Sequence, residues 1–146
     1  YSRSPFELSG GEKRKVAIAG ILAAKPDVLV VDEPTAGLDP MAAMETMDLF
    51  KKIHDEEGTD IILVTHDMNL VAKYADRVIV LGDGKVVFDG KPAGLFQLDL
   101  SEYSLDMPDI YKAFREFEDK GLKLLKIRDL RSIDDLADAI KEAYHE

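Results

Sequence analysis

Two short stretches decide the fold: LSGGE at Leu8–Glu12 and VLVVDEP at Val28–Pro34. In the first, Ser9 and Glu12 have the spacing of a capping box, which indicates the start of a helix. The second is a branched apolar run that ends in two adjacent carboxylates, which is typical of a strand buried on both faces of a parallel sheet. Together they favour an α/β protein in which a glycine-containing helix start and an acidic strand end are available to a ligand.

The composition of the chain excludes several classes of protein. The chain has 146 residues, 46% of them hydrophobic, no cysteine and a net charge of −10. Without cysteine there is neither a disulfide framework nor a thiolate metal site. The acidic balance argues against a nucleic-acid or anionic-lipid binder. Because no apolar run approaches the roughly 20 residues needed to cross a bilayer, we expect any membrane association to run through a protein partner.

Outward from these stretches, the sequence predicts alternating helices and strands. Capping residues, proline and glycine bound the helices, and short branched apolar runs mark the strands. The expected order is a helix from Ser9 ending before Pro26, a strand at Asp27–Asp32, a helix at Pro40–Glu57, a strand at Asp60–Thr65, a short helix capped by Asp67, and a hairpin turning at Asp83-Gly84. This order predicts a parallel sheet covered by helices, with an antiparallel hairpin at one edge.

The remaining third of the chain is expected to be mostly helical. A short helix at Lys91–Gln97 and a polar linker at Asp99–Met107 precede a helix at Pro108–Lys120. An apolar run at Leu122–Ile127 leads to a last helix, which Ser132 and Asp135 cap. We therefore predict two domains, 1–98 and 99–146. The apolar residues of the last two helices are expected to form a core stripe, a contact with a second subunit, or both; they are Ile110, Phe114, Phe117, Leu136 and Ile140.

Three groups of residues carry the chemistry. Ser9, Gly10 and Gly11 offer a hydroxyl, backbone N–H groups and an uncrowded approach to a phosphate oxygen, although a plain helix cap explains Ser-Gly-Gly about equally well. Asp32 and Glu33 end a strand and point different ways, so they can divide metal binding and acid–base work. His66 follows the next strand; a lone histidine there is more often a structural residue. His54 and His145 are expected to face solvent.

The order of these motifs resembles the ATPase subunit of ATP-binding cassette (ABC) transporters. The resemblance implies that Ser9, Gly10, Gly11 and Glu12 form the signature motif, which contacts the γ-phosphate of ATP held by a partner subunit. It also implies that Asp32 holds Mg²⁺, that Glu33 activates the attacking water, and that His66 is the switch histidine. The stretch PTAGLD that follows Glu33 resembles the D-loop, with Asp39 placed across the dimer interface.

The segments around the signature motif, Tyr1–Glu7 and Val16–Ala23, are similar to the ATPases of energy-coupling factor (ECF) transporters, which take up vitamins and metal ions. This resemblance implies a second ABC ATPase subunit, a transmembrane coupling subunit and a substrate-binding membrane subunit as partners, with the chain at the cytoplasmic face of the membrane. It also implies that the C-terminal extension joins two ATPases.

The phosphate-cradling loop G-x-x-x-x-G-K-[ST] is missing from the sequence. We therefore expect the C-terminal part of an ATPase domain that alone binds ATP weakly, does not hydrolyse it and is prone to aggregation. One alternative is a non-catalytic chain that only donates the signature loop to a complete partner. Another is an ABC-type ATPase of DNA repair, which the acidic composition and the lack of sustained heptads disfavour.

Overall fold

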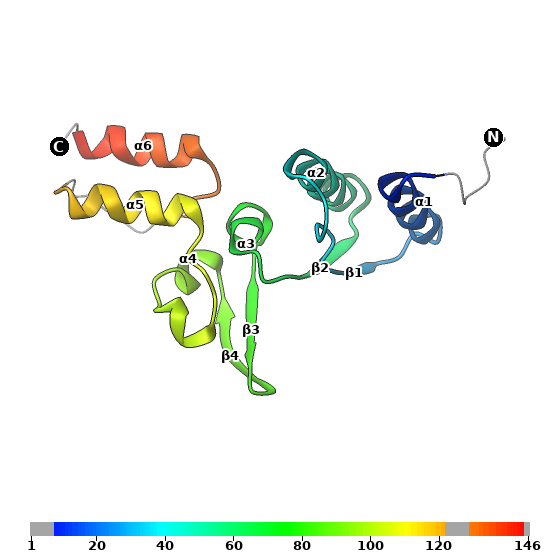
Figure 1. The fold of residues 1–146 in the computed structure, drawn as a ribbon, viewed down its shortest axis with the longest axis horizontal. Helices are drawn as coiled ribbons and strands as arrows, with labels where there is room; N and C mark the ends of the chain where they lie inside the picture. The colour runs from blue at the N-terminus through cyan, green and yellow to red at the C-terminus, as the bar shows by residue number, and fades with distance from the viewer. Residues whose placement is uncertain (1–7, 122–128, 145–146) are drawn as a thin grey trace. The chain divides into compact units, whose positions relative to one another are not determined.

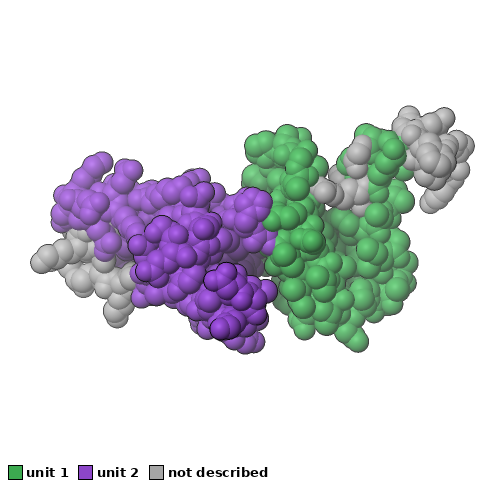
Figure 2. Space-filling view, turned by 60° about the horizontal axis from the view of Figure 1, so that its bottom comes forward, with its two compact units in different colours: residues 1–64 green, residues 65–146 purple. Residues whose placement is uncertain are grey.

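A computed structural model describes residues 8–121 and 129–144. These residues form an α/β protein with two compact units, residues 1–64 and 65–146, which are coloured separately in Figure 2. The predicted fold class is confirmed. The predicted division into domains 1–98 and 99–146 stays a prediction, and the segments 1–7 and 122–127 lie outside the described residues.

The first unit holds α1 (Gly10–Leu22), β1 (Val28–Asp32), α2 (Pro40–Glu57) and β2 (Asp60–Val64) (Figure 1). Strands β1 and β2 pair in parallel, with Val28 opposite Asp60 and Asp32 opposite Val64. As predicted, α1 ends before Pro26, and α2 begins at a proline. Gly58 ends α2 in the left-handed region, at φ 72°, where glycine has no steric penalty.

Helix α2 covers one face of the β1–β2 pair. Its buried apolar residues Met47, Phe50 and Ile53 form the core of this unit together with Leu29 of β1. The opposite face of the pair is aliphatic and open; Val28, Val30, Ile62 and Val64 are between 48% and 61% exposed. The prediction of strands buried on both faces is therefore wrong for the described residues, because a helix packs on only one side.

The apolar stripe of α1 is also largely uncovered. Val16 and Ile21 are 56% and 51% exposed. These residues lie on a single regular helix, and the described part of the chain offers them little to pack against.

The second unit contains α3 (Met68–Tyr74), β3 (Val78–Gly82), β4 (Lys85–Gly90), α4 (Pro92–Leu95), a 3₁₀ helix η2 (Leu100–Tyr103), α5 (Asp109–Asp119) and α6 (Ile133–Tyr144). Asp83 and Gly84 both have positive φ, 50° and 73°, as the predicted tight hairpin requires. The hairpin is a two-stranded sheet of its own. Its predicted place at the edge of the parallel sheet stays a prediction.

One apolar core holds the second unit together. It joins α3, α4 and α5 to residues Leu130 and Leu136 at the start of α6. Leu100 of η2 is 3% exposed and belongs to the same core. The prediction that 99–107 is a polar linker is therefore wrong, since Leu100, Leu105 and Met107 give this segment an apolar side that packs inward.

No helix in the described ranges is long and apolar enough to span a membrane.

Candidate nucleotide site

The start of α1 is a complete capping box. The Ser9 hydroxyl oxygen accepts a hydrogen bond from the Glu12 backbone N–H at 3.2 Å, and the Ser9 N–H donates to the Glu12 carboxylate at 2.8 Å. Hydrogen bonds from the Ser9 backbone and hydroxyl hold the pKa of the Glu12 carboxyl below its usual value. The cap therefore fixes the direction in which α1 begins, and a phosphate bound through Ser9 would have to redirect its hydroxyl hydrogen.

The fold of the first unit does not require a glycine at position 11, where Gly11 stands. It lies in the first turn of α1, and a Cβ added there would meet no atom within 4 Å. A glycine in a helix costs up to about 1 kcal/mol relative to alanine. Nothing in the described fold offsets this cost, so the open space at Gly11 suits the close approach of a group from outside the unit.

The two acids at the end of β1 sit in different backbone conformations. Asp32 is the last residue of the strand and is exposed. Glu33 turns into the left-handed region, at φ 43°, and its N–H donates to the carbonyl oxygen of Val64 at 2.9 Å. That conformation costs a non-glycine residue about 1–2 kcal/mol, and such strain is concentrated at functional sites. Asp32 and Glu33 therefore differ in backbone conformation although they are adjacent in sequence.

The segment after Glu33 is a series of tight turns. The Glu33 carbonyl accepts from Ala36 N–H at 3.1 Å, and Gly37 has φ 72°. Asp39 then caps α2, because its carboxylate accepts from the Ala42 N–H at 3.0 Å. In the described unit, Asp39 is thus a helix cap; a role across a subunit interface stays a prediction.

A groove of about 500 Å³ joins the signature segment to the segment after Glu33. Ser9, Gly11 and Glu12 line one end, and Leu38 and Ala42 line the other. Sequence reasoning missed this groove, because α1 and α2 are separate in sequence and only their packing brings the two motifs onto one surface. The groove therefore brings Ser9, Gly11 and Glu12 onto one surface with Leu38 of the predicted D-loop.

His66 lies in the second unit, in a short connection before α3. The Thr65 hydroxyl accepts from the Asp67 N–H at 3.0 Å, and Asp67 caps α3 by accepting from the N–H groups of Asn69 and Leu70 at 2.9 and 3.4 Å. These bonds fix the backbone on both sides of His66, whose side chain is exposed. The placement of His66 beside Glu33 stays a prediction. His54 is exposed as expected, and its Nδ1 lies 3.0 Å from the Thr59 carbonyl oxygen.

Asp32 fits the metal ion that the motifs imply. It is an exposed carboxylate at the carboxyl end of a parallel strand, and Mg²⁺ is usually held by one or two protein carboxylates together with phosphate oxygens and water. No group of three or more His, Cys, Asp or Glu side chains among the described residues forms a metal cage.

Comparisons with known proteins match these motifs. Residues 1–72 match the family model described as "AAA domain, putative AbiEii toxin, Type IV TA system". Two relatives carry the name "energy-coupling factor transporter ATP-binding protein EcfA2". The one from Mesoplasma florum is 47% identical over 96% of this chain and 45% of its own length, and the one from Streptococcus pneumoniae is 49% identical over 87% and 46%.

Two solved structures are also similar. CbiO1 from Clostridium perfringens, described as part of the ABC transporter complex cbiONQ, gives a TM-score of 0.60 at 41% identity, covering 76% of this chain and 45% of that one. The ATP-binding cassette MJ0796, a dimer bound to ADP and Pi, gives 0.54 at 39% identity, covering 62% and 38%.

The signature segment, the acidic end of β1 and these similarities define the class as an ABC ATPase. The chain belongs to the ECF-type ABC ATPases and corresponds to a C-terminal portion of such a domain. It spans about half the length of the curated relatives that it matches.

Proposed function

We propose that the chain supplies one half of the ATP-hydrolysing site of an ECF-type importer. In this role its residues act together with a phosphate-binding loop and with a second ABC ATPase subunit. The relatives are named as ATP-binding proteins of ECF transporters, and a similar structure is a dimer bound to ADP and Pi. These similarities support ATP as the nucleotide.

Each residue has a distinct part in the proposed reaction. Asp32 holds Mg²⁺, which when bound neutralises charge on the phosphates. Glu33 orients and deprotonates the attacking water, and His66 donates a hydrogen bond to the γ-phosphate. On the other nucleotide of the dimer, Ser9, Gly10 and Gly11 close over the γ-phosphate, Glu12 holds the cap, and Asp39 lies at the subunit interface.

The observation that carries the proposal is the left-handed conformation of Glu33. Its backbone turn is held by a 2.9 Å hydrogen bond to Val64, the residue two before His66 in the chain. An acid that only solvates a strand end has no reason to adopt a strained conformation, whereas a base that must point away from the metal-binding Asp32 has one.

The relatives' names also support a place in transport. We propose that nucleotide-driven closing and opening of the ATPase dimer moves a transmembrane coupling subunit, which works with a substrate-binding membrane subunit to take up a vitamin or a metal ion. The chain then lies at the cytoplasmic membrane face through these partners. The C-terminal helices α5 and α6 are proposed to contribute to the contact between two ATPases.

Steady-state ATP hydrolysis tests the proposal. The chain is mixed with a subunit that carries the phosphate-binding loop, and Glu33→Gln is expected to lower the turnover rate by about 10²–10⁴. Asp27→Asn is the matched control, because Asp27 is an exposed acid immediately before the opposite end of the same strand. The chain alone should not turn ATP over; hydrolysis by the pure chain would contradict the proposal.

The open space at Gly11 and the complete cap of α1 also favour a second function, in which the chain is not catalytic and only donates its signature loop to a partner ATPase. If the chain only donates its signature loop, hydrolysis by the mixture survives Glu33→Gln but is lost in Ser9→Arg. If its own acids are used, both variants lose activity.

A further inference from the structure

Helix α3 begins two residues after His66 and has only seven residues. A helix this short is marginal alone, so its direction depends on what it packs against. Met68, Val71 and Ala72 are buried in the core that includes Tyr111 and Phe114 of α5 and residues at the start of α6. The C-terminal helices therefore form the surface on which the helix after His66 rests.

At its beginning, α3 is joined to α5 by a reciprocal contact across 40 residues of sequence. The Asn69 side-chain oxygen accepts from the backbone N–H of Asp109 at 2.8 Å, and the Asn69 amide donates to the Asp109 carboxylate at 3.4 Å. The N-cap residue of α5 is Pro108, which makes no side-chain cap. Asn69 supplies the missing acceptor from a distant part of the chain.

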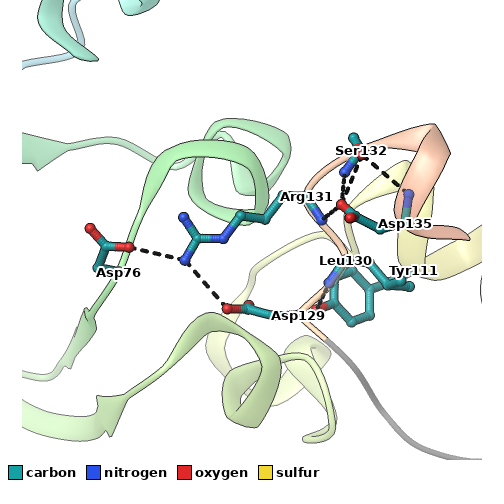
Figure 3. A network of polar contacts seen from close by, with 7 residues as sticks. All are labelled: Asp76, Tyr111, Asp129, Leu130, Arg131, Ser132 and Asp135. Carbon is teal, nitrogen blue, oxygen red and sulfur yellow. Dashed lines mark hydrogen bonds and ion pairs between the residues drawn. The ribbon is translucent and has the colours of Figure 1, made fainter. Parts of the chain in front are cut away.

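Just past its end, α3 is joined to the segment before α6 by an ion pair. Asp76 accepts from the Arg131 guanidinium at 3.0 Å, as Figure 3 shows. Arg131 is itself held, because its backbone N–H donates to Asp135 at 2.9 Å and its guanidinium contacts Asp129 at 3.3 Å. An ion pair this exposed adds little to stability, so its main effect is to hold the segment before α6 against the end of α3.

We propose that Asn69 and Arg131 are positioning residues for His66. They tie both ends of α3 to the helices α5 and α6, and these helices thereby fix the start of α3, which lies two residues after His66. This inference rests on the proposed role of His66 in hydrolysis.

The first test uses the full chain alone and needs no activity. Hydrogen exchange is measured at the amides of Val71 and Ala75, which donate to the Asp67 and Val71 carbonyls within and at the end of α3. Asn69→Ala and Arg131→Met are expected to speed exchange about twofold to fivefold and to move the NMR signal of the His66 ring. Unchanged exchange in both variants overturns the proposal.

The control is Arg77→Met. Arg77 makes a bidentate pair with Asp89, at 2.8 and 2.7 Å, in the β3–β4 hairpin of the same unit. This pair is at least as well formed as that of Arg131, but it does not touch α3. The control is expected to leave α3 exchange and the His66 signal unchanged; an effect as large as that of Arg131→Met would mean a general loosening and would overturn the proposal.

The second test measures hydrolysis by the chain mixed with the subunit that carries the phosphate loop. Arg131→Met and Asn69→Ala are expected to lower kcat about fivefold or more with little change in KM for ATP, because geometry rather than binding is lost. Arg131→Lys keeps the charge and should recover most of kcat. Faster α3 exchange with unchanged kcat would reduce these residues to a structural role and refute positioning.

The two proposals fail in different ways. If Glu33→Gln leaves hydrolysis intact, the proposed function fails, and with it the use of His66. If Glu33→Gln abolishes hydrolysis while Arg131→Met and Asn69→Ala have no effect, only the positioning role fails.

Discussion

Replacing Gly11 with alanine should separate stability from activity. A Cβ at Gly11 meets no atom within 4 Å, and the residue lies in a regular helical turn. The substitution therefore creates no clash, and the helix preference of alanine should leave the free energy of unfolding unchanged or raise it by up to about 1 kcal/mol.

Hydrolysis should respond in the opposite direction. If a phosphate oxygen of a partner's nucleotide approaches the Gly11 backbone, the added methyl group keeps it about 1 Å or more too far away. A misplacement of that size can lower turnover about 10²-fold. The variant is therefore expected to be at least as stable as the parent and nearly inactive in the mixture with the subunit carrying the phosphate loop.

Urea unfolding followed by circular dichroism gives the stability, and ATP turnover of the mixture gives the activity. Gly58→Ala is the control, because a Cβ there also meets no atom, but the residue has φ 72°. That variant should lose about 1–2 kcal/mol of stability from backbone strain alone. Full activity of the Gly11→Ala mixture would refute the reasoning, as would a stability loss comparable with that of the control.

Three further predictions concern the described units. Tyr111→Phe leaves the buried N–H of Leu130 without the hydroxyl that accepts it at 3.2 Å, so urea unfolding should show a loss of about 1–3 kcal/mol; an unchanged midpoint would contradict this. The Val30 side chain is 61% exposed on the open aliphatic face, so Val30→Lys should reduce self-association in sedimentation velocity. It should change the free energy of unfolding by about 0.5 kcal/mol or less. Leu29→Ala, on the buried face of the same strand, should lower the free energy of unfolding by about 2–5 kcal/mol. Because the folded pKa of Glu12 lies below its ordinary 4.5, its stabilisation is present above that pH and is lost as the pH falls through the folded pKa; the fall in stability from pH 7 to pH 3 should be smaller in Glu12→Gln, and an equal fall would contradict the assignment.

Features that depend on residues close in sequence could be predicted. The Ser9–Glu12 and Ser132–Asp135 capping boxes, the glycine end of α2 and the hairpin turn at Asp83-Gly84 all follow from contacts within four residues. Their side chains and backbone satisfy one another locally, so the tertiary structure has little power to change them.

Features that depend on distant partners could not be predicted. The Asn69–Asp109 and Asp76–Arg131 contacts join segments 40 and 55 residues apart, and no spacing rule connects them. The open face of β1–β2 was missed for a related reason. An apolar strand looks the same in sequence whether one or two layers cover it, and only the arrangement of α2 decides which side chains are buried.

Local structure explains some of the predicted site residues but not others, and the unexplained ones favour a functional interpretation. Capping by itself accounts for Ser9 and Asp39, which would be good cap residues in any protein. It does not account for Gly11, where the fold has room for a side chain, or for Glu33, where the backbone is strained. Both choices oppose local stability, and natural sequences accept such choices mainly at functional sites. A capping role alone does not explain these two residues, whereas the proposed close approach to Gly11 and the proposed directed acid at Glu33 do.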